Sequence, residues 1–594
     1  MLSDKERGRT MKQFNGQGIR EERGVVLIVA LLVLAVLSVL GLAFLTTART
    51  EDTIAANYRN HTAAFYAAEA GTESGIATLK ALLRGNPTPT DAQLAGLVAP
   101  ALTDPNYAFN AFRVQRVRTV LPYSYRTTLS GGAYTGLFAW TTDYVVTASV
   151  TGPRGSQARL SQKVQHVGIP LFQFGIFRGR GIPLQLFPGT LMTFNGRIHA
   201  NSNIHLGTIA GLQLESYVTA TGNIYRHSVA DPSYRGPGVV QIKDAGGNLQ
   251  TLNFDHEYDY NFATLWAEND WKNAALSTFG GRVQDSTMGV QEIVPPIPDA
   301  LYDPNDAPAS SHLMIEKGSA ADSPDLEAAK MYYKAGLIIE NEKAYDQAGN
   351  EVKINTCKDT NGKQAVRKEK FYDADNKTDM EVTQIDVGAL TACGVMPKNG
   401  ILYATAKEGS PNKGEGIRLV NGAQLPGPTA ENPQGGLTVV SENPVYVMGN
   451  YNTKDKNGNP RTVSTPLTDL VPAAVLGDAI TVLSNNWDKN KSDAKGKDPL
   501  SARPAADTEV NAAVASGQSL RFLEDWRVTA GLKTLTYNGS DVGLWNLKYA
   551  LPNTCCPNYA PPIRKYGYDT LFDTSQPPGT PMGAIVTRGQ WSQL

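Results

Sequence analysis

The stretch "EERGVVLIVALLVLAVLSVLGLAFLTTARTED", Glu21–Asp52, contains the longest apolar run of the chain. Its 21 residues from Val25 to Leu45 carry no charge. As a helix they would be about 31 Å long, which matches the hydrocarbon core of a bilayer. A secretory signal has a shorter apolar part, followed by a small-residue cleavage site. The stretch therefore predicts a helix that crosses a membrane once.

The polar segment before the run predicts the orientation of this helix. Six basic residues stand against four acidic ones, a net charge of +2. They are Lys5, Arg7, Arg9, Lys12, Arg20 and Arg23 against Asp4, Glu6, Glu21 and Glu22. Positive flanks stay on the cytoplasmic side, so we expect the rest of the chain to be exported. The translation start could be Met1 or Met11, and the sequence does not decide between them.

The residues after the run extend the helix. There is no Pro, and no Gly between Thr46 and Ala70, and the segment is rich in Ala, which favours helix. We expect one rod over residues 25–83. Small residues allow two helices to approach closely, and here they are Ala63, Ala64, Ala67, Ala68 and Ala70. The segment would thus let another helix approach the rod closely.

The stretches "RGVVLIVALLVLAVLSVLGLAF" and "EDTIAANYRNHTAAFYAAEAG" resemble the N-terminal region of PilX-type minor pilins of the type IV pilus system. The resemblance implies that residues 1–24 are a leader, cut by a prepilin peptidase after Gly24, and that Val25 becomes the N-methylated terminus. It also implies a membrane and assembly helix that includes Val25, Val29, Leu45, Ala64, Phe65, Ala68 and Glu69. The implied partners are other minor pilins, the major pilin, the peptidase and, before assembly, inner-membrane lipid.

Val29 departs from the family pattern. Most pilins carry a Glu at this fifth position of the mature chain, where it pairs with the terminal amine of a neighbouring subunit. A buried carboxylate without its partner is costly, and a subunit with nothing beyond it has no amine to pair with. The resemblance and this departure together favour a tip or initiating subunit over a major pilin.

Residues 84–168 predict a small antiparallel sheet after the helix. "RGNPTPTDAQ" is a breaker-rich linker. The segments "AFRVQRVRTV", "DYVVTASVTG" and "ARLSQKVQHVGI" alternate apolar and polar residues, with the turn "GPRGS" between the last two. We expect a pilin-like α+β unit.

Residues 169–254 and 424–594 show a different sequence pattern. Short strands with turns between them recur in "MTFNGRIHANSNIHLG", "YVTATGNIYRHS", "GLTVVSENPVYVMGNYN" and "AAVLGDAITVLSNNW". This pattern predicts a sandwich or a β-solenoid, and the period-two strand–turn–strand units favour the solenoid. These segments also resemble an uncharacterised domain that often follows PilX-type N-termini, which implies no chemistry. The fold class is thus α+β: a membrane helix with a small sheet, followed by a mainly-β domain.

Residues 255–423 read as an α+β insert within that domain. We expect two helices, "ATLWAENDWKNAAL" and "PDLEAAKMYYKAG", and several hairpins. Cys357 and Cys393 lie in this insert, and a disulfide between them is the first interpretation for an exported chain. The adjacent Cys555 and Cys556 could form a strained disulfide with each other, pair elsewhere or stay reduced.

The residue patterns that could carry chemistry favour structural roles. His199 and His205 lack a third ligand nearby, so we expect hydrogen-bonded strands and no metal. The acidic cluster in "FDHEYDY" predicts a solvated loop, and Asp455 in "NTKDKNGNP" a tight hairpin without the later Glu of a calcium loop. The sequence contains no GxSxG elbow, HExxH or Walker loop. We expect no enzyme and no cofactor.

The composition suits an exported β-rich protein. Gly is plentiful at 56, only 19% of residues are charged, and the net charge of −1 gives no attraction to nucleic acid. The predicted function is a structural minor-pilin-like subunit, first in the inner membrane with a periplasmic body, then at a pilus tip or the cell surface. Two alternatives stay open: a polysaccharide-binding or polysaccharide-cleaving solenoid on a pilin-type anchor, and a membrane-anchored protein that never assembles.

Overall fold

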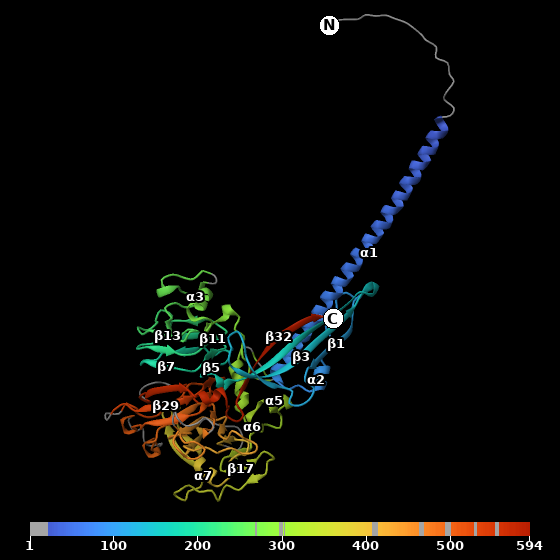
Figure 1. The fold of residues 1–594 in the computed structure, drawn as a ribbon. Coiled ribbons are helices and arrows are strands. Elements are labelled where there is room, and N and C mark those ends of the chain that lie inside the picture. Colours follow the sequence, from blue (N-terminus) through green and yellow to red (C-terminus); the bar gives the residue numbers. More distant parts are fainter. Residues whose placement is uncertain are drawn as a thin grey trace, which may run out of the picture.

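The computed structural model describes residues 22–594, apart from 268–269, 296, 298–300, 302, 304, 407–413, 462–468, 493–499, 528–530 and 553–557. A long helix projects from the molecule, its lower end lies on a small sheet, and a large β-rich body follows (Figure 1). The fold class is α+β, with the helix first and the β-rich part after it.

Helix α1 (Glu22–Gly85) is a single element of 64 residues. At 1.5 Å per residue it is about 96 Å long, because neither Pro nor a run of breakers interrupts it. The expected rod over residues 25–83 lies within it. The lower half packs on the sheet, while the upper half extends away from the rest of the molecule (Figure 1).

The small sheet has five antiparallel strands in the order β1-β3-β4-β32, with β2 also on β3. They are β1 (Ala108–Arg116), β2 (Tyr125–Thr128), β3 (Phe138–Thr151), β4 (Gln157–Pro170) and β32 (Met582–Gln593). The short helix α2 (Asp91–Ala95) packs against β1. Three of the strands are those expected from the alternating segments. Of the other two, β2 was not expected, and β32 is the C-terminal strand, which the sequence pattern assigned to the second β-rich part.

The body is built on a stack of parallel strands. In its longest sheet ten strands are parallel neighbours, in the order β15-β11-β8-β5-β30-β28-β25-β23-β21-β16, and the hairpin strands β17 and β18 continue it antiparallel. The members are β5 (Ile176–Arg178), β8 (Ile198–Ala200), β11 (Val218–Ala220), β15 (Val283–Gln284), β16 (Leu337–Glu340), β17 (Lys343–Asp346), β18 (Glu351–Val352), β21 (Ile401–Thr405), β23 (Leu437–Val440), β25 (Ala473–Leu476), β28 (Ala513–Ser516) and β30 (Asp541–Gly543). We call the body the parallel stack.

Four smaller sheets complete the sides of the parallel stack. Two of them follow the first half of the chain: β6 (Leu184–Leu186), β9 (Ile204–Leu206) and β12 (Ile224–Tyr225), and β7 (Met192–Phe194), β10 (Leu212–Leu214), β13 (Val240–Lys243) and β14 (Leu249–Thr251). The other two are β19 (Val366–Asp373), β20 (Thr378–Asp386), β22 (Glu415–Val420), β24 (Val445–Met448) and β26 (Ile480–Leu483), and β27 (Thr508–Asn511), β29 (Thr534–Gly539) and β31 (Ile563–Tyr568).

The registers explain why these short strands stack. In the first half Ile198 pairs with Val218, and Ile204 with Ile224, so apolar residues lie above one another at a spacing of 20 residues. The polar pair His199 and Thr219 has the same spacing. Ile198, Val218 and Ile204 are all buried. Aligned apolar ladders bury their surface between neighbouring turns of the chain, which stabilises strands of only three residues.

The path of the chain through the stack is not sequential. From β5 the chain moves outward to β15 at one end, crosses to β16 at the other end, and winds back to β30, which pairs with β5 in the middle. The chain therefore enters and leaves the stack at its centre. It enters from β4 and leaves to β32, and those two strands pair with each other.

The segment expected as an insert is only partly outside the stack. Strands β16, β21 and β22 lie within residues 255–423 and are stack members, because their apolar residues complete the ladders. The helices of this region are α3 (Asp270–Phe279), α4 (Ala307–His312), α5 (Pro324–Ala329), α6 (Met331–Lys334) and α7 (Val387–Ala392). The single helix expected over "PDLEAAKMYYKAG" is split into α5 and α6 at Lys330.

Lys330 breaks that helix for a physical reason. Its backbone is extended, with ψ at 134°, and its ammonium is buried and donates to the Asp322 carboxylate at 2.8 Å and to the Lys317 carbonyl at 3.0 Å. A buried charge needs such partners, and a continuous helix would carry the side chain elsewhere.

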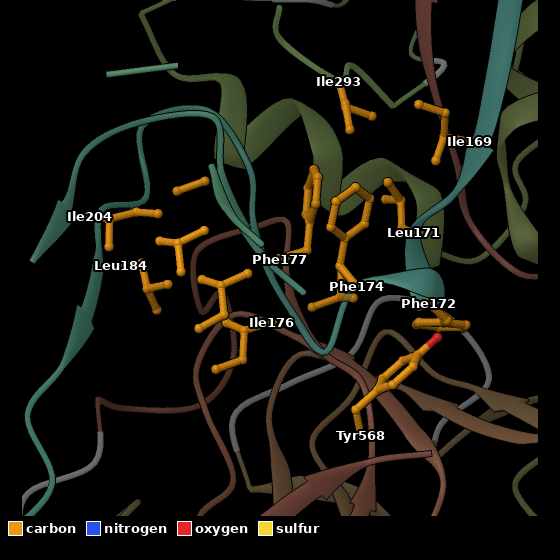
Figure 2. Close-up of a cluster of buried hydrophobic side chains, with 14 of the residues drawn as sticks. Ile169, Leu171, Phe172, Phe174, Ile176, Phe177, Leu184, Ile204, Ile293 and Tyr568 are labelled. Carbon is orange, nitrogen blue, oxygen red and sulfur yellow. The ribbon is translucent and has the colours of Figure 1, made fainter. Parts of the chain in front are cut away.

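The largest core is continuous from the small sheet into the stack. Figure 2 shows Leu171, Phe172 and Phe174, which follow β4, beside Ile176 and Phe177 of β5. Ile169 of β4 belongs to the same cluster. The two parts are thus packed as one body around the point where the chain passes between them.

Candidate functional site: helix α1 and the groups around it

The upper half of α1 is apolar and exposed. Val25 is 62% exposed, Val29 54% and Leu45 59%. The helix from Gly24 is long and apolar enough to cross a membrane, and its most apolar window has a mean hydropathy of 3.3 with none of it buried in the molecule. Apolar surface of this extent is not stable in water. This half of α1 is therefore built to be covered by lipid or by other helices.

The expected cut lies at the start of this surface. Gly24 and Val25 are both helical, near the N-terminal end of α1. A Cβ atom on Gly24 would meet nothing within 4 Å, so Gly24 is not required for packing inside this molecule. The remainder of the expected leader, residues 1–21, lies outside the described residues.

Val29 lies one turn beyond Val25 on the exposed helix. From Val25 to Ala48 the chain carries no ionisable side chain, and Arg49 is the first. The position where most pilins carry a carboxylate is therefore fully apolar here, and this part of α1 can be buried without removing any side-chain charge from water.

The small residues of the lower half pack on the chain's own sheet. Ala64 and Ala68 are fully buried, in one cluster with Val150, Ala158 and Leu160 of β3 and β4. For these two alanines the expected contact with a second helix is wrong. Small side chains do permit a close approach here, but the partner is the sheet of the same molecule.

Two residues expected in the assembly helix remain near the surface. Glu69 is exposed. Phe65 is half-buried, and its ring lies 6.1 Å from that of Trp591 in β32 in an edge-on arrangement. Two turns beyond Phe65, Glu73 accepts two hydrogen bonds of 2.6 Å from Arg588 of β32. The C-terminal strand thus fixes the lower half of α1 by an aromatic contact and an ion pair.

The two histidines considered as metal ligands have other partners. His199 is fully buried, and its ring nitrogens bond the Thr219 hydroxyl and the Asn201 amide oxygen, each at 2.9 Å. Burial lowers the pKa of His199 to about 4, so its imidazole is neutral. His205 bonds the carbonyl of His227. Both are hydrogen-bonded residues of the stack, and the described residues hold no group of three metal-binding side chains.

The two acidic segments form capped turns. Asp255 accepts hydrogen bonds from the backbone N–H groups of Glu257 and Tyr258, each at 2.9 Å. Asp455 accepts from the N–H groups of Asn457 and Asn459 at 2.8 and 2.9 Å, which is the hairpin that "NTKDKNGNP" predicted. Carboxylates used in this way satisfy the backbone locally.

The first pair of cysteines forms a disulfide. Cys357 and Cys393 are bonded, with their Cα atoms 5.7 Å apart, and they close a loop that carries β19 and β20. Cys555 and Cys556 lie outside the described residues.

Sequence reasoning missed two groups around the junction of helix, sheet and stack. One is β32, whose partner strand β4 is more than 400 residues away, as for the Gln162 amide that donates to the Gly589 carbonyl. The other is a pocket of about 220 Å³ beyond the end of α1, which includes His166 and Trp140. No local sequence pattern predicts the place of β32 or the pocket, because both depend on contacts between distant segments.

Comparison with known proteins places the N-terminal segment. Residues 23–73 match the family model described as PilX N-terminal, so the chain carries a PilX-type N-terminal segment. Among solved structures it is similar to the competence-associated pilin ComZ from Thermus thermophilus, with 11% identity, 90% of this chain and 97% of that chain covered, and a TM-score of 0.29. A likeness at that score carries no functional argument. No curated protein matches the chain.

Proposed function

We propose that this chain is a minor pilin, a structural subunit that primes assembly or occupies the tip of a type IV pilus or a related pseudopilus. The observation that carries the proposal is the exposed, uncharged half of α1, which begins next to Gly24 and projects from a folded body. The match of residues 23–73 to the PilX N-terminal family supports the same reading.

The mechanism is burial of one surface in two successive environments. In the membrane the apolar half of α1 is covered by lipid, with the body on the outer side. In the filament the same surface packs among helices of other pilins, so assembly exchanges lipid contacts for close helix contacts. The lower half is already held by the small sheet, so the body is carried on a fixed rod.

The tip or priming role rests on Val29 and on the bulk of the body. A carboxylate at position 29 would need a neighbouring amine, and an apolar residue does not. The parallel stack also extends from the lower end of α1 and is much larger than the sheet on which α1 lies (Figure 1). A subunit repeated along a shaft would have to accommodate that bulk at every position.

We propose no enzymatic role. The polysaccharide alternative would gain support from a groove with paired free carboxylates. The described pocket between the two halves of the stack contains one carboxylate, Asp541, and it is engaged by Arg178 at 2.9 Å. This pocket therefore gives no support to cleavage of a polysaccharide.

Mass spectrometry of the mature N-terminus tests the pilin assignment. We expect a chain that begins with N-methylated Val25, and we expect Gly24→Ile to leave the leader in place. Gly41→Ile, in the same helix and equally free of neighbours, is the matched control and should be processed normally. A chain purified from its own cell envelope that still carries residues 1–24 would refute the proposal.

The tip assignment is tested by counting subunits. Gold-labelled antibody against the body should mark one end of a filament, with no labels along the shaft. Val29→Glu should lower incorporation, because the new carboxylate would find no amine, while Val29→Leu should not. Labels spread along filaments, or better incorporation of Val29→Glu, would contradict a tip position.

A further inference from the structure

A pocket lies on one face of the small sheet, between the part of this face that α1 covers and the part that α5 and α6 cover. The face that packs on α1 includes Tyr144 and Val164. Helix α1 ends at Gly85, but the same face continues for two more rows, Thr142 with His166 and then Trp140 with Gly168. Helices α5 and α6 cover the next part. Between the end of α1 and these helices remains a cavity of about 220 Å³.

The floor of the pocket is made by small residues. Gly168 pairs with Trp140 on one side and with Ala584 of β32 on the other. Gly168 has no side chain and Ala584 has only a methyl group, so the floor is low, and the flexible end of Met582 lies 3.3 Å from where a Cβ atom of Gly168 would be. Trp140 stands at its edge and is 45% exposed, which leaves part of the indole ring free for contact.

Three methionines form the walls. Met314, Met331 and Met582 line the cavity, and they come from the segment after α4, from α6 and from β32. Thioether sulfurs are polarisable, and they make favourable contacts with aromatic rings. A tryptophan and three methionines around a flat floor suit a flat aromatic guest better than a branched aliphatic one.

One polar group in the pocket lacks a partner. His166 lines the cavity and is only 5% exposed, and its Nε2 atom has no hydrogen-bond partner among the described residues. Burial lowers the pKa of His166 to about 4, so the imidazole is neutral at neutral pH. A buried polar atom without a partner costs free energy, which a hydroxyl group of a guest would recover.

We propose that this pocket binds a small uncharged aromatic molecule that carries a hydroxyl group. The ring lies over the floor beside the flexible end of Met582, in contact with Trp140 and the other two methionines, and the hydroxyl bonds Nε2 of His166. A cavity of about 150 Å³ lined by apolar side chains can hold benzene, so this one accommodates one substituted ring. Lys334, the one cationic side chain among the lining residues, makes a carboxylate-bearing ring the competing guest.

The test uses the full chain in lipid nanodiscs with methyl-¹³C methionine, because partition into lipid would confuse a bulk assay. The probe is 4-methylphenol, compared with toluene and 4-methylbenzoate. We expect 4-methylphenol to shift three of the ten methionine methyl signals and to bind about tenfold more tightly than toluene, the ratio of one ordinary hydrogen bond.

Two variants separate the hydrogen bond from the shape. His166→Leu should lower the preference for 4-methylphenol over toluene to about one while both still bind. Gly168→Val should push the flexible end of Met582, which lies 3.3 Å from an added Cβ, into the cavity and abolish binding of both. Gly189→Ala, whose Cβ would meet nothing within 4 Å, is the control. Unchanged signals of the methionines outside the pocket identify variants that still fold.

Three results would overturn the proposal. The first is no shift of any methionine signal by millimolar 4-methylphenol in the wild type. The second is an unchanged preference for 4-methylphenol over toluene in His166→Leu. The third is tighter binding of 4-methylbenzoate, which would assign the pocket to an anion held by Lys334. None of these depends on pilus assembly, so the pocket can fail or stand independently of the proposed function.

Discussion

Individual small residues determine how α1 meets its sheet. A Cβ atom on Gly75 would lie 2.6 Å from Cγ1 of Val146 and 3.0 Å from the ring of Phe112. Val146 is fully buried and β-branched, so it has few other rotamers. The sequence showed that this part of the helix is rich in small residues, but it could not show whether another subunit or the chain's own strand occupies the space beside them.

Gly75→Ala decides between two opposite effects. Alanine favours helix over glycine by about 1 kcal/mol, but overpacking a filled interface costs about 1–3 kcal/mol, and the stiff Val146 makes the second effect larger. We expect α1 to undock more often, so that trypsin cleaves after the exposed Lys80 several times faster than in the wild type.

Gly41→Ala is the control for this experiment. It gives the same gain in helix propensity at a position where an added Cβ meets nothing within 4 Å. Slower cleavage after Lys80 in Gly75→Ala than in the wild type would show that propensity outweighs the contact with Val146.

At the scale of elements, the helix and three of the five strands of the small sheet could be predicted, but β2 and β32 could not. Helix α1 and strands β1, β3 and β4 follow from local periodicity, because their pattern is complete within each segment. Strand β32 has an ordinary local pattern, and its place beside β4 depends on the chain returning to the centre of the stack. The junction pocket could not be predicted for the same reason, since Trp140, His166 and Met582 come from three separate strands.

The break at Lys330 also shows what local pattern lacks. The segment around it has good helix formers, but a buried ammonium must meet Asp322, and this contact with a neighbouring loop overrides propensity. The stack strands show the reverse case, where short apolar segments were recognisable but their order was not. The order of the strands depends on which turns of the chain become neighbours, and the sequence of one segment does not determine this.

Strand β32 closes the small sheet, so its removal should release α1. We expect a chain truncated after Pro581 to expose the backbone of β4 and to lose the contacts of Arg588 and Trp591 with α1. Hydrogen exchange of β4 and of residues 60–85 should become much faster, while the stack between β5 and β30, which has its own ladders, should stay protected.

Truncation after Gln590 is the matched control for this element. It removes Trp591 and the last pairs of β32 but keeps the rows from Met582 to Arg588, so most of the protection of β4 should remain. Equal exchange rates of β4 in the two truncated chains would show that β32 does not hold the sheet together.

For the whole molecule, the two halves of the stack are joined at the centre by β5 and β30, and again by the segment that crosses from one end to the other. His312 in α4 belongs to this crossing segment. Its Nδ1 bonds Glu316 at 2.9 Å and its Nε2 bonds Asp478, between β25 and β26, at 3.3 Å. Asp478 also accepts from the N–H groups of Lys548 and Ala550, each at 2.6 Å. The His312 imidazole and the Asp478 carboxylate together thus connect three distant segments.

The contact of His312 with Asp478, which holds the crossing segment on the stack, therefore depends on pH. Burial alone would lower the pKa of His312, but the hydrogen bonds and charges of Asp478 and Glu316 outweigh it and raise that pKa. A raised pKa in the folded state means that the contribution to stability is complete below about pH 6.5, the unfolded value, and is lost as pH rises through the folded pKa. Lys548, which also pairs with Glu316 at 2.6 Å, keeps its charge over this window.

Hydrogen exchange measured below and above this pH range tests whether His312 holds the crossing segment. We expect residues 307–316 to lose about tenfold in protection between pH 6 and pH 9, after correction for intrinsic exchange, because a charge-assisted hydrogen bond contributes about 1.5–3 kcal/mol. His312→Gln should be less protected at pH 6 and lack this step, whereas His61→Gln, at an exposed position of α1, should keep it. If His312→Gln kept the same pH step, the titrating group would lie elsewhere. The Glu316–His312–Asp478 chain would then hold the crossing segment without a change of protonation at His312 in this pH range.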